Sequence, residues 1–349
     1  MSGDRTKADA ADQGRSSLKI DQWPSQDHAR WVRVKTRTGR FDRDAILQDL
    51  AAPTVRGLAQ AMGRFLAYVS YRGLLPSEGS IGLALTGELV NDYVDHIRLR
   101  MRAGSVHEEL RRLRTGFQIL LPDNMPDWFN ALPAAPSHAE VEASRKPIVR
   151  PDVASVLAAA YRVFDAIPTD RPDTVSCQLA RNCLIVAFSA LFELRLADLT
   201  RIRFGEHLTC AGGRWRLAFL DNVKNDSFLL FDMPPPLAVR LEHYLATFRV
   251  ALLRQNDDHG FLWVGRCGTR ILPAAIAIAI DKFGRSYLNR ALNSHVFRHA
   301  FVVATMTRNP ADAGLAAAGL GHTSEQMVQS CYSRSGSGEL SKLWLKKLA

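Results

Sequence analysis

The sequence predicts a mainly α protein with a small antiparallel sheet (α+β). Two long stretches, before residue 121 and after residue 152, repeat apolar residues every three to four positions, as amphipathic helices do. Between them, residues 122–151 carry many prolines, which interrupt regular structure and mark a domain boundary. Residues 215–231 instead alternate in hydropathy around an Asn-Asp turn, which is the pattern of a β-hairpin. A length of 349 residues fits a division into two domains.

Residues 1–43 form a basic N-terminal segment that we expect to be partly disordered. Between residues 30 and 40 all the charges are basic, and apolar residues alternate with them, which predicts a short strand or an extended arm. Arg33, Lys35 and Arg37 are the candidates for contacting DNA phosphates. The alternative is that this segment is a solvated basic tail.

Residues 44–121 read as a helical domain. One helix is predicted from Thr54 to Tyr71, and a second is predicted to open at Thr86. A third follows a capping box that runs from Ser105 to Glu108.

Three arginines on this third helix lie mainly off its apolar stripe, at Arg111, Arg112 and Arg114. A charge run on a helix is usually just a solvated face. Arginines without matching acids, however, suit phosphate contacts or entry into the major groove. We therefore take these three as candidate DNA-binding residues.

Residues 122–151 are predicted to be an interdomain linker, and residues 152–332 a second domain. In the linker, Trp128, Phe129 and Leu132 are expected to attach part of the stretch to a neighbouring domain.

The second domain begins with two apolar helices, and Arg195 directly follows the second of them. The hairpin places Lys224 at its turn. Taken alone, such an arginine is more often structural than catalytic, and a lysine in a turn is more often just solvated. The elements predicted here are helices over residues 153–164, 180–194, 237–253 and 272–283, with a short buried strand over 261–264.

The last quarter of the chain carries the densest cluster of chemically active residues. His295, Arg298 and His299 are spaced so that a helix puts them on one face. Leu-Gly-His322 follows, and a capping box then opens a further helix that ends near Tyr332. Two histidines, a guanidinium and a phenol that converge indicate chemistry on a phosphate.

These residues resemble the C-terminal signature of the tyrosine recombinase (phage integrase) family. The signature reads H-x-x-R, then L-G-H, then a tyrosine about ten residues later. His295 and Arg298 form the first element, His322 ends the second, and Tyr332 is the third.

The resemblance extends upstream, with two departures. Residues 194–199 resemble the family's first arginine box, usually G-L-R-x-x-E-L, with Arg195 as the arginine and Asp198 as the acid. Glu193 replaces the customary glycine, and we expect its carboxylate to point outward. Lys224 matches the lysine of the family's hairpin, but the second basic residue of K-T-G-K is missing.

The resemblance implies a helical core-binding domain and a DNA breaking-rejoining catalytic domain, which cuts through a 3′-phosphotyrosyl intermediate. In this reaction Arg195 and Arg298 hold the phosphate and His322 donates a hydrogen bond to it. Tyr332 attacks the phosphorus. An unperturbed phenol has a pKa of about 10, so it needs a base to remove its proton, and His295 is the candidate. The lysine protonates the leaving 5′-oxygen, and His299 either supports the site or packs in the core. The implied catalytic residues are Arg195, Lys224, His295, Arg298, His322 and Tyr332.

Composition bounds the remaining choices. A net charge of +10 favours a polyanionic partner. Five cysteines without a C-x-x-C pair fit a reducing cytoplasm, and neither a disulfide framework nor a metal site is expected. No H-E-x-x-H or P-loop motif is present, so we expect no metal and no cofactor. The chain shows neither a secretory signal nor an uninterrupted membrane span.

The resemblance therefore implies a cytoplasmic site-specific recombinase that serves a mobile element or replicon and cuts and rejoins double-stranded DNA through a Holliday junction. The resemblance implies a tetramer on paired sites and a monomer or dimer off DNA, and it leaves open an accessory protein that sets direction. Residues 333–349 are expected to be a docking tail, although folding back on its own domain is the alternative. A type IB topoisomerase and a non-catalytic DNA-binding relative are the rival functions.

Overall fold

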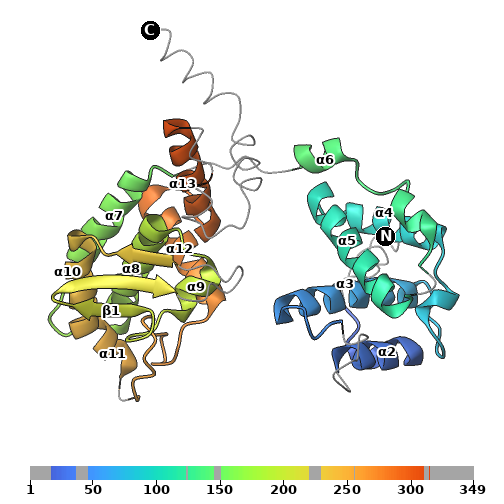
Figure 1. Cartoon of the computed structure of the whole chain (residues 1–349), viewed down its shortest axis with the longest axis horizontal. Coiled ribbons are helices and arrows are strands. Elements are labelled where there is room, and N and C mark those ends of the chain that lie inside the picture. The colour runs from blue at the N-terminus through green and yellow to red at the C-terminus, as the bar shows by residue number, and fades with distance from the viewer. Residues whose placement is uncertain are drawn as a thin grey trace, which may run out of the picture. The chain divides into compact units, whose positions relative to one another are not determined.

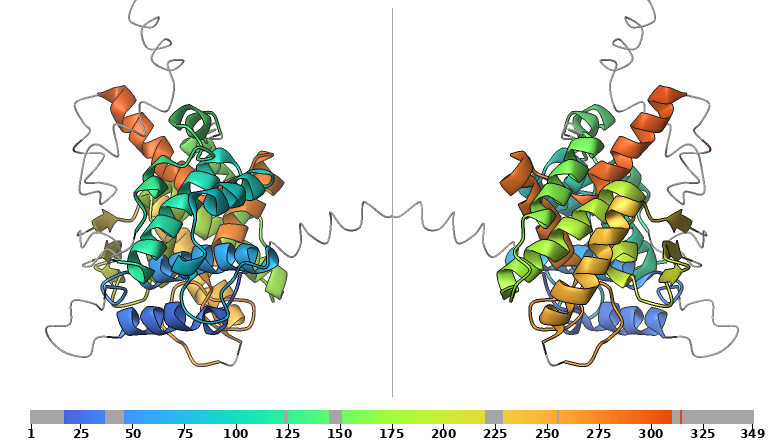
Figure 2. Two further views of the ribbon diagram at one scale, coloured as in Figure 1. Left: turned by 90° about the vertical axis from the view of Figure 1, so that its right-hand side faces the viewer. Right: turned by 90° about the vertical axis from the view of Figure 1, so that its left-hand side faces the viewer.

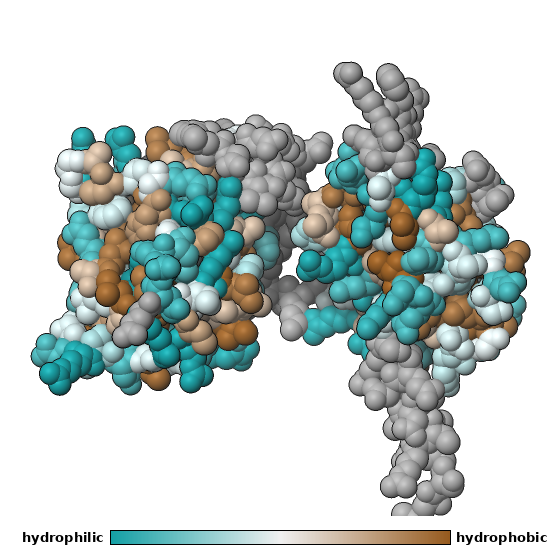
Figure 3. Space-filling model, turned by 90° about the horizontal axis from the view of Figure 1, so that it is seen from below, coloured by the Kyte–Doolittle hydropathy of each residue, from teal (hydrophilic) through white to brown (hydrophobic). Residues whose placement is uncertain are grey.

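The computed structural model describes residues 17–36, 46–122, 125–144, 151–219, 229–254, 256–309 and Gly314. The chain divides into two compact units, Met1–Pro147 and Ile148–Ala349, each with its own hydrophobic core. Helices dominate both units, and the single sheet belongs to the second (Figure 1). On the face that the space-filling view shows, hydrophilic and hydrophobic residues are interspersed in each unit (Figure 3). The predicted division into arm, domains, linker and tail is finer than these two units and stays a prediction.

Unit 1 is built around one central helix, α5 (Ala103–Leu120), which contacts four other helices. It packs closely on α3, where a Cβ on Gly116 would lie 2.5 Å from the sulfur of Met62, so a larger residue would require Met62 to move. The elements of unit 1 are η1 (Ile20–Gln22), α2 (Ser25–Lys35), α3 (Ala52–Tyr71), η2 (Ile81–Leu83), α4 (Gly87–Arg98), α5, η3 (Asp127–Ala131) and α6 (His138–Ala143).

The predicted helices α3 and α4 are confirmed. The apolar stripe of α3 is buried from Leu58 to Val69, and Thr86 caps α4 by accepting a hydrogen bond from the Leu89 amide at 3.1 Å. The predicted capping box of the third helix is wrong. Helix α5 begins at Ala103, two residues earlier, and Ser105 lies inside its first turn.

The expected strand or extended arm near residue 30 is also wrong, because residues 25–35 form the helix α2. Trp31 and Val34 are fully buried three residues apart, so helical spacing overrides the alternation of apolar and basic residues. The buried Asp27 ties α2 to the loop before η2, because its carboxylate accepts hydrogen bonds from Ser80 Oγ (2.6 Å) and the Ile81 amide (2.7 Å). Burial raises the pKa of Asp27, although both hydrogen bonds oppose the rise.

The proline-rich stretch is less irregular than expected. It contains η3 and the short helix α6, which a true capping box between Ser137 and Glu140 opens. Phe129 and Leu132 are buried in the core of unit 1, with the Phe129 ring 5.5 Å from that of Phe117. The prediction that these residues attach the stretch to a domain is confirmed.

Unit 2 is a helical bundle around α8, with a small sheet at one side (Figures 1 and 2). By length and composition α8 could cross a membrane, but 67% of its most apolar window is buried inside the unit, as in a core helix. The elements are α7 (Val153–Asp165), α8 (Thr174–Phe192), α9 (Leu196–Arg201), β1 (Leu208–Ala211), β2 (Arg214–Phe219), β3 (Leu229–Asp232), α10 (Pro235–His243), the π-helical η4 (Tyr244–Arg249), α11 (Val250–Leu253), α12 (Pro273–Leu288) and α13 (Ser294–Arg308).

The sheet has the order β1-β2-β3 and is antiparallel throughout. The predicted hairpin is confirmed, with Leu217 opposite Phe231 and Phe219 opposite Leu229. Strand β1 was not predicted, because three of its four residues are exposed and its sequence does not alternate. The predicted strand over residues 261–264 is wrong, since this segment makes only isolated bridges. Its apolar residues are nevertheless buried as expected.

Candidate active site

The site begins where α8 ends. Glu193, the first residue after α8, has φ 43° and ψ 33°, a left-handed conformation that glycine adopts without strain. The chain turns there, and Arg195 becomes the residue before α9. A non-glycine residue in this conformation costs about 1–2 kcal/mol. This turn gives a physical reason for the glycine that is customary at the position of Glu193.

The second arginine reaches this turn from α13. Asn293 caps α13 by accepting a hydrogen bond from the Val296 amide at 3.1 Å, and α13 packs against α8. Arg298 is only 8% exposed, and its Nη1 donates a hydrogen bond of 2.5 Å to the backbone carbonyl of Glu193. The carbonyl left unpaired at the end of α8 therefore holds Arg298 beside the turn that carries Arg195.

The two guanidinium groups also interact electrostatically. Burial and, after it, the positive charge of Arg195 lower the pKa of Arg298 to about 10, against the attraction of Asp198 and Glu193. Burial also lowers the pKa of Arg195, against the attraction of Asp198. Two cations that repel each other in poorly solvated surroundings form a site that an anion would stabilise. We call Arg195 and Arg298 the arginine pair.

Asp198 supplies the counter-charge beneath the arginine pair. It is fully buried on α9, and its Oδ1 lies 3.3 Å from Nε of Arg201, one turn further along the helix. The Arg201 guanidinium in turn lies 5.1 Å from the centre of the Phe219 ring in β2. The sequence reasoning did not identify Arg201, although its spacing of three residues from Asp198 on a helix was a usable signal.

The expectation that Glu193 points outward is wrong. The residue is half-buried, and burial raises the pKa of its carboxyl to about 8, with Arg298 opposing the rise. The sequence could not reveal this, because α13, whose Arg298 contacts this turn, lies about a hundred residues further along the chain.

The remaining predicted catalytic residues are less fully described. His295 and Arg298 share α13 as predicted, but His295 is exposed whereas His299 is half-buried. The structure thus brings Arg195 and Arg298 together and leaves His295 at the surface, one turn before Arg298. Lys224, His322 and Tyr332 lie outside the described residues. Among the described residues, no cluster of His, Cys, Asp or Glu could hold a metal ion.

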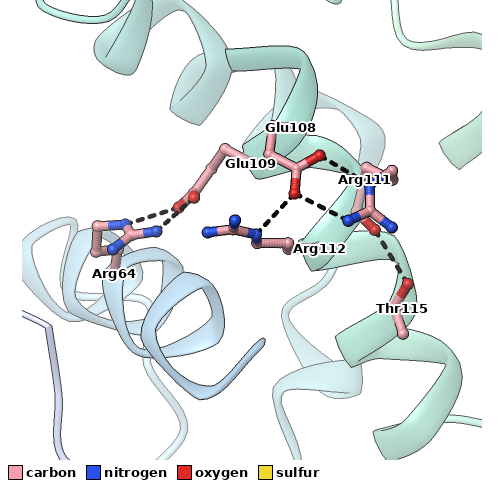
Figure 4. Close-up of polar contacts among 6 residues, drawn as sticks. All are labelled: Arg64, Glu108, Glu109, Arg111, Arg112 and Thr115. Carbon is pink, nitrogen blue, oxygen red and sulfur yellow. Dashed lines mark hydrogen bonds and ion pairs between the residues drawn. The ribbon is translucent and has the colours of Figure 1, made fainter. Parts of the chain in front are cut away.

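The basic face of α5 is the candidate DNA-binding surface of unit 1 (Figure 4). The expectation of arginines without matching acids is wrong for Arg111 and Arg112. Glu108 accepts two hydrogen bonds of 2.8 Å from Arg111 and one of 2.9 Å from Nε of Arg112. These bonds lower the pKa of Glu108, and the bonds from Arg111 have the largest effect. Arg114 is exposed beyond this cluster.

A hollow of about 520 Å³ lies beside these residues, between α3 and the start of α5. Three arginines line it, and the buried Glu109 holds one of them, Arg64, through two hydrogen bonds of 2.8 and 2.5 Å (Figure 4). Glu109 also accepts a hydrogen bond of 3.1 Å from the Tyr93 hydroxyl. Arg64 is thus fixed by a fully partnered carboxylate. The lining residues are Arg64, Arg100, Met101, Gly104, Ser105, Glu108, Glu109 and Arg112.

The other predicted DNA-binding residues lie near the end of α2. Arg33 and Lys35 are exposed in its last turns, and Arg37 lies outside the described residues. Because α2 packs against α5, these cations belong to the same folded unit as the α5 arginines.

We predict that Glu108→Gln raises the affinity for duplex DNA. The exposed ion pairs contribute about 0–1 kcal/mol each, and a phosphate that binds Arg111 or Arg112 has to replace them. The affinity measured by titration at low salt should rise about threefold and fall more steeply as salt is added. The matched control is Glu88→Gln, which removes an equal charge from an exposed site on α4. Equal gains in both variants would show that only net charge matters.

Comparison with known proteins gives matches both in sequence and in fold. No family model matches the chain. It is 30% identical over 162 residues to the tyrosine recombinase XerC of two strains of Lactobacillus delbrueckii subsp. bulgaricus. This match covers 46% of the chain and 51% of XerC, so the chain spans about half the length of the curated relatives it matches.

The fold matches solved structures over most of the chain. The XerH site-specific recombinase bound to difH substrate, in a pre-cleavage complex, has a TM-score of 0.59 at 13% identity, over 96% of this chain and 93% of XerH. A lambda integrase (75–356) dimer bound to a COC′ core site has a TM-score of 0.53 at 12% identity, over 84% of this chain and 93% of the integrase. At these identities the likeness shows the fold.

Proposed function

We propose that the chain is a tyrosine recombinase and acts as a site-specific DNA recombinase, because it resembles XerC in sequence and two recombinases in fold. It cuts and rejoins double-stranded DNA one strand at a time, through a 3′-phosphotyrosyl intermediate and a Holliday junction. The substrates are DNA sites of integration, excision or resolution.

One observation carries this proposal: the arginine pair at the end of α8, in which Arg298 is buried and Arg195 half-buried. A phosphodiester has two non-bridging oxygens, which gain negative charge as the phosphorus becomes five-coordinate. Guanidinium groups bind such oxygens through two parallel hydrogen bonds. Arg298 is already held by the Glu193 carbonyl, so it needs little reorganisation when the phosphate arrives.

The other catalytic roles follow from the family motif. Tyr332 attacks the phosphorus, and His322 donates a hydrogen bond to a non-bridging oxygen. His295 takes the phenolic proton, for which its exposed position on α13 leaves room. Lys224 protonates the leaving 5′-oxygen. The covalent phosphotyrosyl link stores the bond energy, so rejoining needs no metal or nucleotide cofactor.

The proposed partners are double-stranded DNA and further copies of the same chain. The XerH and lambda integrase structures both contain DNA, and the lambda integrase structure is a dimer. We propose a tetramer on paired sites, a docking role for residues 333–349 and action in the cytoplasm. The α5 arginines and the α2 cations would contact the DNA backbone.

The test compares recombination with relaxation on one plasmid. Duplexes that bind the protein are first selected from a random-sequence pool and cloned as a pair into a supercoiled plasmid. A recombinase produces smaller circles, whereas a type IB topoisomerase yields only relaxed plasmid. Binding without either product would indicate a non-catalytic relative and overturn the proposal.

A further inference from the structure

Glu193 is a titratable group in the site that the proposed reaction does not use. Resting on the proposed function, we propose that Glu193 is a proton-linked positioning residue for the scissile phosphate. Its carboxyl is neutral when the phosphate occupies the arginine pair and takes up a proton from solvent where it was ionised before, and cleavage therefore weakens at alkaline pH.

The backbone of Glu193 puts its carboxyl in this position. Glu193 occupies the left-handed turn after α8, and its side chain is half-buried there. Its carbonyl accepts the hydrogen bond from Arg298 Nη1. Main chain and carboxyl therefore both act on Arg298, which in turn acts on the phosphate.

The charges around Glu193 define how it titrates. Arg298 from α13 is the charge that stabilises its ionised form, whereas burial favours the neutral form and prevails. At the start of α9, Arg195 and the buried Asp198 both interact with Arg298. An ionised Glu193 would add a second carboxylate to this group and so lower the positive potential that the phosphate meets.

Phosphate binding and protonation are consequently coupled. The negative charges of a bound phosphate and an ionised Glu193 repel each other, so phosphate binding should raise the pKa of Glu193 above the value of about 8 that it has without DNA. Near pH 7 the carboxyl is already mostly neutral and binding is unhindered. Above pH 8, phosphate binding requires that Glu193 first take up a proton from solvent. The affinity of the arginine pair for the phosphate therefore falls as the pH rises.

The experiment measures covalent adduct formation across pH on a nicked duplex selected for binding to the protein. The full-length chain is compared with Glu193→Gln, which keeps the shape of the side chain but cannot ionise. With the duplex below saturation, the ratio of the wild-type rate to the Glu193→Gln rate should fall about tenfold between pH 7 and pH 9, as the neutral fraction of Glu193 in the DNA-free protein does. Titration of Tyr332 and Lys224 affects both proteins and cancels in the ratio.

Two further variants keep this test decisive. Glu193→Gly, which suits the left-handed turn, should match the pH profile of Glu193→Gln if the latter folds poorly. Glu206→Gln removes an exposed carboxylate of the same unit and should keep the wild-type profile. A constant ratio across pH overturns the role of Glu193 while leaving the recombinase proposal intact. Absence of any adduct at pH 7, with wild type and variants alike, overturns both.

Discussion

Arg298→Ala is expected to slow DNA cleavage by about 10²-fold or more while changing DNA binding far less. The guanidinium is buried, held by the Glu193 carbonyl and coupled to Arg195, so alanine leaves part of the transition-state charge without a partner. Binding depends on many backbone contacts elsewhere and should fall only a few-fold. Single-turnover cleavage and a gel-shift titration measure the two effects separately.

The matched control for this prediction is Arg298→Lys. Lysine keeps the positive charge but lacks the forked geometry of the guanidinium. The cleavage rate of this variant should therefore lie between those of the wild type and the alanine variant. If binding and cleavage fall equally in the alanine variant, Arg298 serves binding or folding and not the chemical step.

Trp263→Ala is expected to destabilise unit 2 by about 3–5 kcal/mol. The side chain is fully buried, with its ring 5.2 Å from that of Phe188 in the central helix. Its Nε1 donates a hydrogen bond of 2.8 Å to the carbonyl of Leu199 in α9. Trp263 therefore connects α9, which follows Arg195, to the core. Chemical denaturation monitored by circular dichroism measures the free energy of unfolding.

Trp263→Phe separates the two contributions. Phenylalanine keeps an aromatic ring but leaves the Leu199 carbonyl without its hydrogen-bond donor. The free energy of unfolding should therefore fall by about 1–3 kcal/mol. A loss in the alanine variant no larger than in the phenylalanine variant would mean that the ring contributes little.

The long helices could be predicted from the sequence because each buries one continuous apolar stripe. In α3 the spacing of Leu58, Met62 and Phe65 fits only a helix, and all three are buried. Helix α2 shows where this reasoning fails. Its buried residues are Asp27, Trp31 and Val34, and a polar residue at the first of these positions conceals the helical stripe.

The arginine pair was predictable from motif spacing, but its setting was not. Contacts between segments far apart in the sequence, such as Arg298 with the Glu193 carbonyl, decide which groups are buried. The hydrogen bonds of Glu108 are different, because its partners Arg111 and Arg112 lie only three and four positions away and the capping-box interpretation obscured this local signal. Local sequence therefore predicts the elements and the residue types, and tertiary contacts set their charge states.

The central claim is tested most directly by locating the covalent bond between protein and DNA. The protein is trapped on a nicked duplex selected for binding, digested with protease, and the peptide that carries the nucleotide is identified by mass spectrometry. The account predicts a 3′-phosphotyrosyl bond at Tyr332, and no SDS-stable adduct in a Tyr332→Phe variant that still binds DNA. An adduct on another residue, such as Tyr287 or Tyr244, or one that persists in Tyr332→Phe, would contradict it.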